Sequence, residues 1–360
     1  MKIGVIGCGM ISDWYFKAAR RFPMLEITAC ADARAESAQS QGAKYGIPAV
    51  PVDAIFADPE IELVLNLTPP KIHYAIARRT LESGKHAYSE KPFAVRLEEA
   101  RELLELGRRH HRRIGCAPDT FLGGGQQSVR KLIDDHWIGK VLAGTAIFTG
   151  RGPETWAHAP AFYDEGAGPM LDLGPYFATQ LVNLLGPAKA VTAVTCRGAA
   201  ERVGGPDTVP RVYPVRVDTH QTGIIEFVSG AVITVLGSYE VHRGSHPFLE
   251  LYGDGGSISM HHPNYFGGPV KLFLPGYEDW QDVPPAHIYN NDARSLGVAD
   301  MVDAIEHDRP HRASGELAFH VLEILLAFVR SGAAGKRVEL ASCCERPEPM
   351  PLGLRDGEVR

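Results

Sequence analysis

A glycine-rich turn near the start of the chain contains the first residues whose spacing points to chemistry. Gly7, Gly9 and Ser12 fill the three positions of a G-x-G-x-x-G pattern, with serine in place of the third glycine. The first glycine permits a tight turn and the second lets backbone amides approach a phosphate. The third position governs helix packing, which a small serine can also serve. Together with Met10 and Ile11, the pattern predicts a pyrophosphate site at a helix N-terminus.

An acidic residue follows at the spacing that a dinucleotide site requires. Asp32 ends an apolar run that begins at Leu25, and its carboxylate is placed to accept hydrogen bonds from ribose hydroxyls. The same carboxylate would repel a 2′-phosphate, and Arg34, two residues further on, would relieve that repulsion only in part. This arrangement predicts NAD in preference to NADP. The alternative is that Asp32 only caps the following helix.

Strands and helices alternate around these residues. Strand-like runs cover residues 2–6, 25–32, 61–67, 86–89 and 113–117, and helical stretches cover residues 11–22, 72–82 and 97–110. Such alternation is typical of an α/β fold whose parallel sheet is covered by helices on both faces. We therefore expect a doubly wound Rossmann domain over residues 1–120, with the cofactor at the carboxyl ends of its strands.

Further motifs make the chain resemble a known family. A Thr68-Pro69 turn is followed by His73, and Gly-Lys-His at residues 84–86 precedes Glu-Lys-Pro at residues 90–92. With the Rossmann start, these motifs resemble the glucose-fructose oxidoreductase and inositol dehydrogenase superfamily over nearly the whole chain. The resemblance implies further cofactor-binding residues, namely Thr68, Pro69, His73, Glu90 and Lys91.

The same resemblance gives Lys91 a catalytic role. It implies that Lys91 lies beside the nicotinamide and contacts the reacting hydroxyl, with Glu90 and Pro92 holding it in position. An ammonium at the end of a parallel strand can stabilise a developing alkoxide. Without the surrounding motif, a lone Lys-Pro pair would be interpreted as a surface turn.

The second candidate segment is glycine-rich and leads into an apolar helix. Residues 166–168 read Gly-Ala-Gly, and Asp172 and Tyr176 follow. The family pattern here is Asp-x-Gly-x-His, so Tyr176 stands at the histidine position, which changes the proposed acid or base without arguing for inactivity. The four-residue spacing lets both side chains face one cleft, where the helix end and Lys91 favour carboxylate and tyrosinate. Alternatively, Tyr176 only packs the first helical turn.

Several other residues are candidates for substrate binding, in addition to Lys91, Asp172 and Tyr176. Asp119 and Thr120 fall where family members often place a substrate-contacting Asn and Arg. Trp156 is suited to stack on a sugar face, and His158 and His220 are suited to hydrogen-bond hydroxyls. For each of these residues a structural role is an equally good interpretation.

Beyond residue 120 the pattern changes to short strands separated by turns. Strand-like runs cover residues 141–148, 190–196, 223–227, 231–236, 248–252 and 270–273, with hairpin turns at residues 229–230 and 254–256. We expect an α+β domain over residues 121–341, followed by a tail at residues 342–360. Its large, mostly antiparallel sheet would be covered by helices on one face. The resemblance implies that the other face mediates homo-oligomers, as a dimer or tetramer.

Composition narrows the function classes. The 360 residues are 44% hydrophobic and 22% charged with a formal net charge of -6, and the basic residues are scattered among acidic ones. These values argue against a membrane or nucleic-acid partner. The start of the chain has no room for a secretory signal, and the six cysteines form no paired framework, so we expect a cytoplasmic protein. No histidine cluster has the carboxylate or cysteine spacing of a metal site.

These observations favour one function over two alternatives. The expected enzyme is a NAD-dependent dehydrogenase of a small sugar or polyol, in which Tyr176 accepts the hydroxyl proton and Asp172 orients the substrate and Lys91. One alternative is a redox glycosidase that retains its NAD and cleaves a glycoside by oxidation and elimination. The other is a non-catalytic sensor that binds NAD and a sugar.

Overall fold

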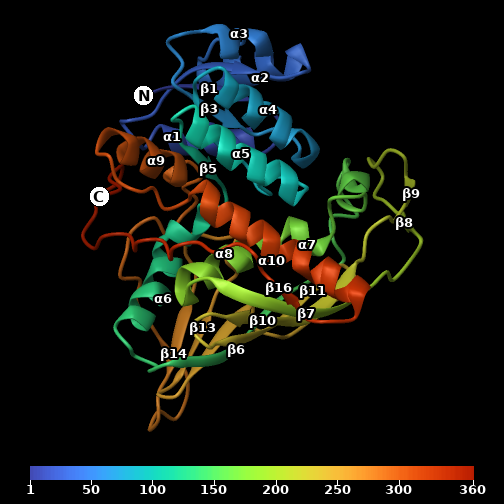
Figure 1. Ribbon diagram of the computed structural model, residues 1–360, viewed down its shortest axis with the longest axis vertical. Helices are drawn as coiled ribbons and strands as arrows, with labels where there is room; N and C mark the ends of the chain where they lie inside the picture. The colour runs from blue at the N-terminus through green and yellow to red at the C-terminus, as the bar shows by residue number, and fades with distance from the viewer.

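The first domain contains a five-stranded parallel sheet. A computed structural model describes all 360 residues of the chain (Figure 1). The strands are β1 (Lys2–Ile6), β2 (Glu26–Ala31), β3 (Leu63–Asn66), β4 (His86–Ser89) and β5 (Ile114–Cys116), in the order β2-β1-β3-β4-β5. The connecting helices are α1 (Ser12–Ala19), α2 (Ala35–Tyr45), α3 (Val52–Ala57), α4 (Pro70–Glu82) and α5 (Leu97–Arg109). Every residue of β3 is buried, as expected for a strand covered on both faces. The doubly wound Rossmann prediction is confirmed.

Two helices of this domain were not assigned from the sequence. The helices α2 and α3 occupy the stretch between residues 32 and 61, for which no helix bounds were predicted. Only Ala38 and Gly42 of α2 are buried, so this helix has no broad apolar stripe that periodicity could detect. Beyond α2, Ala49 forms a single parallel bridge with Cys30, which adds a minimal strand outside β2.

The strand register aligns the carboxyl ends of all five strands along one side of the sheet. Ile6 pairs with Ala31 on one side and Asn66 on the other. Ser89 in turn pairs with Asn66 and Cys116. The turns that follow these strands therefore lie side by side, as expected for a doubly wound sheet.

The second domain is built on a nine-stranded sheet in the order β15-β14-β13-β12-β6-β11-β10-β7-β16. The strands are β6 (Val141–Thr149), β7 (Ala188–Cys196), β10 (His220–Phe227), β11 (Val232–Ser238), β12 (Leu249–Gly253), β13 (Ser257–Met260), β14 (Val270–Phe273), β15 (Gln281–Asp282) and β16 (Val338–Glu339). Only the β6–β11 pair is parallel. A mostly antiparallel sheet is confirmed, and both predicted hairpin turns connect neighbouring strands.

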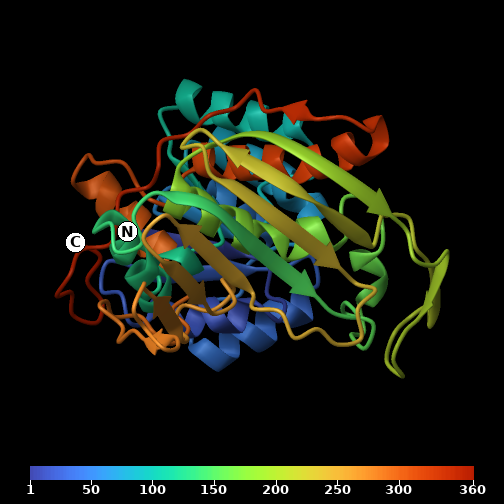
Figure 2. The ribbon, with the colours of Figure 1, turned by 90° about the horizontal axis from the view of Figure 1, so that it is seen from below.

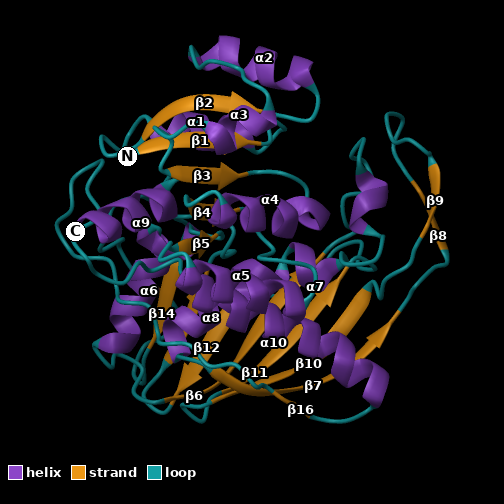
Figure 3. Ribbon diagram, turned by 45° about the horizontal axis from the view of Figure 1, so that its top comes forward, coloured by secondary structure: helices purple, strands orange, loops and turns teal.

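Helices cover one face of this sheet (Figure 3). They are α6 (Gly124–Asp134), α7 (Pro169–Asp172), α8 (Gly174–Leu185) and α10 (Gly315–Ala334). Seen from below, the strands lie in front of these helices, so the other face of the sheet is uncovered (Figure 2). The prediction of helices on one face is confirmed.

Helix α10 bears on the expectation that the chain has no membrane partner. It is long and apolar enough to cross a membrane by those two criteria, although no such run was recognised in the sequence. In this fold it packs between the second sheet, α8 and α5. Its buried Glu323 accepts hydrogen bonds from the backbone amides of Ala341 and Ser342, so the one carboxylate in its middle is satisfied within the protein. We assign α10 to the core.

Four smaller features lie around the domain boundary. A hairpin arm of β8 (Glu201–Val203) and β9 (Val212–Pro214) stands away from the sheet beside the short helix η2 (Ala159–Phe162) (Figure 1). The helix α9 (Leu296–Glu306) packs on α1 and β5 of the first domain. The C-terminal tail also returns to that domain, where Asp356 pairs with Arg21 at 2.5 Å. The short helix η1 (Thr120–Leu122) follows β5.

Candidate active site

The glycine turn has the geometry that its residue types predict. Gly7 has a φ of 106°, and a Cβ there would lie 2.5 Å from the carbonyl carbon of Leu67, so no other residue fits without displacing backbone. Ser12 is fully buried, and its Oγ donates to the carbonyl oxygen of Gly9 at 2.6 Å. The serine at the third position is therefore compatible with the tight turn. Met10 lies on the exposed side of this turn.

Asp32 braces the turn from the neighbouring strand. Its Oδ2 accepts from the backbone N–H of Cys8 at 2.8 Å, and its Oδ1 accepts from the backbone N–H of Arg34 at 2.9 Å. The guanidinium of Arg34 is mostly exposed and lies 3.9 Å from Oδ1. The carboxylate thus supports both the glycine turn and the entry into α2. Its position at the end of β2 is the one that a ribose-binding carboxylate requires.

His73 holds two turns together and is fully buried. Its Nδ1 lies 2.8 Å from the carbonyl oxygen of Pro92, and its Nε2 lies 2.6 Å from the carbonyl oxygen of Thr68. Burial lowers the pKa of His73, and the two carbonyl oxygens act against that shift. With no accessible surface, this side chain positions the Thr68 turn and the turn after β4. His73 was predicted to contact the cofactor, but its buried side chain is not placed to do so.

Glu90 holds the backbone of Lys91 in position. Its Oε1 accepts from the Tyr15 hydroxyl at 2.7 Å, and its Oε2 accepts from the backbone N–H of Lys91 at 2.9 Å. Both oxygens are engaged and the side chain is buried. Glu90 therefore fixes the backbone from which the Lys91 ammonium projects, as the resemblance implied.

The two domains meet through the Lys91 ammonium. Its Nζ donates to the backbone carbonyl of Asp172 at 2.5 Å and to Asp172 Oδ1 at 3.1 Å. The other carboxylate oxygen, Oδ2, accepts from the Tyr239 hydroxyl at 2.8 Å. Asp172 ends α7, and Tyr176 is the third residue of α8, so a break between two short helices presents both side chains. The pair joins the end of β4 to the start of α8.

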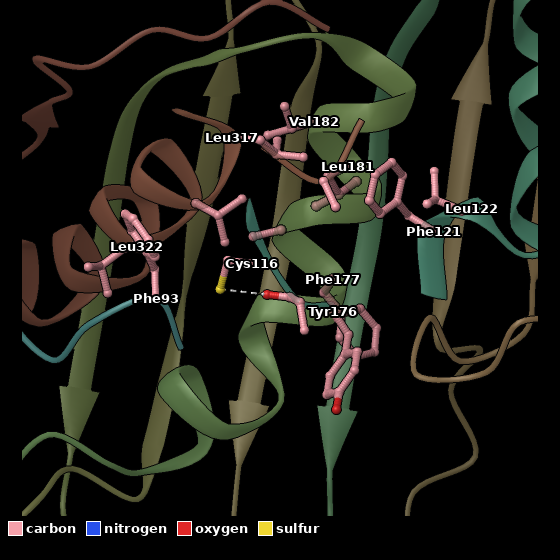
Figure 4. Close-up of a cluster of buried hydrophobic side chains, with 14 of the residues drawn as sticks. Phe93, Cys116, Phe121, Leu122, Tyr176, Phe177, Leu181, Val182, Leu317 and Leu322 are labelled. Carbon is pink, nitrogen blue, oxygen red and sulfur yellow. Dashed lines mark hydrogen bonds between the residues drawn. The ribbon is translucent and has the colours of Figure 1, made fainter. Parts of the chain in front are cut away.

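Tyr176 lies at the boundary between the hydrophobic core and this polar group. The Lys91 Nζ is 5.0 Å from the centroid of its ring, within range of a cation–π contact. Figure 4 shows the ring at the edge of a cluster that includes Phe93, Phe121 and Phe177, with the hydroxyl pointing away from those side chains. The ring is therefore anchored in the core, as the packing interpretation expects, while its hydroxyl leaves the core.

Electrostatics separate the roles of the lysine and the tyrosine. Burial acts to lower the pKa of Lys91, but Tyr176, Asp172 and Glu90 outweigh it and the pKa is raised. Lys91 is therefore an ammonium at neutral pH. Burial raises the pKa of Tyr176, and Lys91 and Arg294 lower it only in part. The expectation that tyrosinate is favoured is wrong for this structure, because desolvation is the largest effect.

Two of the predicted substrate residues have other positions. Asp119 is buried, and its Oδ2 accepts from the backbone N–H groups of Ser295 and Gly297 at the start of α9. Thr120 is buried beside it. Neither offers surface to a substrate, so we correct both assignments to structural roles.

His220 is also placed away from the site. Side chains alternate along a strand, and the core residues Ile225 and Val235 show which face of β10 and β11 points to the helices. By that alternation His220 and its cross-strand partner Ser238 lie on the opposite face, where Nδ1 is 3.0 Å from the Ser238 Oγ. Tyr239, one residue further, faces Asp172.

Trp156 and His158 lie on the loop after β6. Their rings are 5.5 Å apart, and Phe162 packs edge-on to Trp156 at 5.4 Å. The adjacent Tyr163 ring is 5.5 Å from Tyr239, the residue that binds Asp172. The loop therefore approaches Asp172, and the rings of Tyr163 and Tyr239 lie between the loop and this carboxylate.

Two residues of the site were missed from the sequence. Tyr239 follows β11 directly, and only the sheet register shows that it faces Asp172. Arg294 precedes α9 and has no motif around it, yet its charge acts on Tyr176. The only sequence signal for Tyr239 was a tyrosine at the end of a strand. The sequence offers no signal for Arg294.

Fold and site together define a two-domain dinucleotide-binding protein with a lysine, an aspartate and a tyrosine at the domain interface. Residues 1–117 match the GFO_IDH_MocA family model, described as an oxidoreductase family with an NAD-binding Rossmann fold, and residues 126–259 match the GFO/IDH/MocA C-terminal domain. The chain belongs to this family. The groups at the strand ends fit NAD. A side chain at Gly7 would collide with the backbone of Leu67, so the tight glycine turn is required, and Asp32 lies beside this turn.

Relatives and solved structures agree with this assignment. An uncharacterized oxidoreductase of Schizosaccharomyces pombe is 32% identical over 54% of this chain and 54% of its own length. The chain thus spans about half of that relative. D-glucoside 3-dehydrogenase of Escherichia coli is 23% identical, covering 94% of this chain and 97% of that protein. The crystal structure of an NAD binding oxidoreductase from Klebsiella pneumoniae shares the fold, with a TM-score of 0.83 and 22% identity over 95% of this chain and 99% of that one.

Proposed function

We propose that this protein is a dehydrogenase that uses NAD to oxidise a hydroxyl of a sugar or polyol, or to reduce the corresponding carbonyl. The single observation that carries the proposal is the contact of Lys91 Nζ with both Asp172 and the ring of Tyr176. This contact gathers a fixed cation, a carboxylate and a phenol at the end of a Rossmann strand. The name of the E. coli relative, D-glucoside 3-dehydrogenase, supports a carbohydrate as substrate.

The turn residues Gly7, Gly9, Met10 and Ile11 would hold the pyrophosphate of NAD, and Asp32 its ribose. Thr68 and Pro69 follow β3 on the same edge and would line the path towards Lys91. When bound, NAD supplies the acceptor or donor of a hydride. Because Asp32 would oppose a 2′-phosphate, we propose NAD over NADP.

Each residue of the proposed site has a distinct task. Lys91, a permanent ammonium, stabilises negative charge on the reacting oxygen. Tyr176 exchanges the hydroxyl proton, since its hydroxyl leaves the core and has no protein partner that would hold it. Asp172 orients Lys91 through Oδ1 and is itself held by Tyr239 through Oδ2. The fixed Asp172 carboxylate thereby sets the distance between ammonium and phenol.

The uncovered face of the second sheet supports a homo-oligomer. Leu142, Val194 and Val232 are exposed, although they lie on the strands β6, β7 and β11. We propose that a second copy covers this face, in a dimer or tetramer, and light scattering coupled to gel filtration measures it. All six cysteines are free thiols, which supports a reducing, cytoplasmic location.

The proposal is tested by incubating the purified protein with NAD and a panel of aldoses, inositols and glycosides. NADH absorbance and product mass are followed together. Soluble NADH with an oxidised product supports a dehydrogenase. Cleavage of a glycoside without NADH would identify the redox glycosidase instead. Saccharide binding without any product would identify a sensor.

A further inference from the structure

The hairpin arm of β8 and β9 sends one charged side chain back towards the second sheet. Arg202, at the centre of β8, is buried, whereas Glu201 and Val203 on either side of it are exposed. Its Nη1 donates to Glu154 in the loop after β6, and its Nη2 donates to Glu240, two residues beyond the end of β11. A guanidinium is costly to bury unless charged partners surround it. The base of the arm is therefore built around Arg202.

The same guanidinium contacts Tyr239, the residue whose hydroxyl binds Asp172. The Nη2 of Arg202 donates to the backbone carbonyl of Tyr239 at 3.3 Å, and the guanidinium carbon lies 5.6 Å from the centroid of the Tyr163 ring. The Tyr163 ring in turn lies 5.5 Å from the Tyr239 ring. Arg202 thus reaches Tyr239 at its backbone and also through one intervening ring.

Close packing leaves the Tyr239 ring little freedom of its own. Gly152 has a φ of 70°, and a Cβ there would lie 2.5 Å from the Tyr163 hydroxyl oxygen and 2.8 Å from Tyr239 Cγ. The backbone of the loop after β6 therefore packs directly on both rings, which are buried. The position of the Tyr239 hydroxyl, 2.8 Å from Asp172 Oδ2, is set by this packing and by the backbone that Arg202 holds.

The cluster around Arg202 has balanced charges. Arg151 pairs with Glu154 at 2.9 Å and lies 3.8 Å from Glu240, but its side chain is 36% exposed. Glu240 also accepts from the hydroxyl of Thr219, which precedes β10. Removing the guanidinium of Arg202 would leave two carboxylates facing each other with only a half-exposed arginine between them. We expect the segment after β11, which carries Tyr239, to move in response.

We propose that Arg202 is a positioning residue of the active site: it holds the backbone of Tyr239, so that the Tyr239 hydroxyl keeps Asp172 in the place from which Asp172 orients Lys91. The arm of β8 and β9 thereby becomes part of the catalytic machinery, because it supplies this arginine. The inference rests on the proposed function, in which Asp172 and Lys91 serve the reaction. A merely structural arginine would stabilise the arm, and its effect on turnover would not depend on the Tyr239 hydroxyl.

A double-mutant cycle between Arg202 and the Tyr239 hydroxyl tests this dependence. The kcat values of wild type, Arg202→Lys, Tyr239→Phe and the double variant are measured with the sugar that the panel identifies. Arg202→Lys keeps a positive charge between the glutamates, but its single nitrogen lacks the fork that donates to both carboxylates and to the Tyr239 carbonyl. Glu154→Gln is the matched control, because it removes the charge bound by Nη1 and leaves the contacts of Nη2. Thermal unfolding of each variant measures the loss of stability separately.

We expect Arg202→Lys to lower kcat by about three- to tenfold, because the hydrogen bond from Tyr239 to Asp172 is misplaced. The double variant should be no slower than Tyr239→Phe, since without the hydroxyl Arg202 has nothing left to position. Glu154→Gln should lower the melting temperature and leave kcat within about twofold of wild type, because the Tyr239 contact remains. Losses that multiply in the double variant, a wild-type kcat in Arg202→Lys, or an equal loss of kcat in Glu154→Gln would each overturn the inference.

Two further outcomes keep the test decisive. If Arg202→Lys fails to fold, the cycle is repeated with Glu240→Gln, which loosens Arg202 beside Tyr239 and leaves the guanidinium paired with Glu154. Losses that do not multiply then support the inference, and losses that multiply overturn it. A wild-type protein that oxidises no sugar of the panel would refute the proposed function and this inference with it, whereas multiplying losses in an active enzyme would overturn the inference alone.

Discussion

The two sides of the proposed site are built in different ways. On the Rossmann side, the functional groups directly follow consecutive strands, and Glu90 and Lys91 are neighbours in the chain. On the other side, Asp172, Tyr239 and Arg294 come from three segments that only the folded second domain brings together. The first side is therefore specified by local motifs, whereas the second depends on sheet register and loop anchoring.

The two sides also differ in how firmly they are held. Glu90 and His73 brace the Rossmann side through buried hydrogen bonds. The loop that carries Trp156 is tied to the first domain by an ion pair between Lys71 and Asp164 at 2.6 Å, in which the lysine is largely exposed. Exposed pairs contribute little because solvent screens them. This ion pair therefore contributes little to the free energy that holds the loop against the first domain.

The largest expected effect tests whether the second-domain side takes part in chemistry at all. Tyr176→Phe retains the packed ring and removes the hydroxyl, so loss of proton transfer should reduce kcat by roughly 10²- to 10⁴-fold. Because burial raises the pKa of Tyr176, and the base must be deprotonated, kcat/KM for oxidation should still be rising with pH near 10. Tyr176→His should move this limb to lower pH. Full activity in Tyr176→Phe would exclude the assignment.

The next effect concerns the Rossmann side. Lys91→Ala should reduce kcat by roughly 10²- to 10³-fold, because a fixed positive charge at the reacting oxygen is lost. NAD affinity, measured by isothermal titration, should change little, since Lys91 contacts Asp172 and Tyr176 and not the glycine turn. Lys2→Ala, at an exposed ion pair of the same domain, is the control. Equal losses of turnover and NAD affinity would indicate a structural role instead.

Cofactor choice tests the local motif of the first domain. Asp32→Ala should weaken NAD binding by about ten- to a hundredfold, as expected for hydrogen bonds to a charged group, and should weaken NADP binding far less. Titration of both cofactors against wild type and variant measures the ratio. Asp53→Ala, an exposed carboxylate on α3, is the control. A wild-type protein that prefers NADP would show that the placement of Asp32 is wrong.

A smaller effect on kcat is expected from the hydrogen bond between Tyr239 and Asp172, which only the folded second domain forms. Tyr239→Phe removes the hydroxyl that donates to Asp172 Oδ2, and we expect about tenfold lower kcat from the less well-held carboxylate. Tyr163→Phe makes the same change in the neighbouring ring, whose hydroxyl donates to the Arg151 carbonyl. Equal effects of the two variants would mean that Asp172 gains nothing particular from Tyr239.

The fold and half of the site could be predicted from the sequence. The turn at Gly7, the strand ends and the segment from Asp172 to Tyr176 are contiguous patterns, so spacing and resemblance located them. The prediction for Asp119 was wrong because its position in the sequence matches substrate-contacting residues of relatives. In the structure its carboxylate instead caps α9, which lies far along the chain. His220 misled because a single residue of strand register decides which face a side chain occupies.

The remainder depends on long-range contacts that no local pattern encodes. Tyr239 contacts Asp172 from 67 residues away in the chain. Arg294, whose charge acts to lower the pKa of Tyr176, is further away still. The direction of the Tyr176 pKa also required the structure, because it depends on how far burial outweighs two neighbouring cations.

The central claim is that Lys91 and Tyr176 act as one unit across the domain interface, and a double-mutant cycle tests it most directly. The kcat values of wild type, Lys91→Ala, Tyr176→Phe and the double variant are measured with the sugar that the panel identifies. Residues that act as a unit are strongly non-additive, so we predict that the double variant is about as slow as the slower single variant. Losses that multiply would mean that the two residues act independently, and would contradict the account.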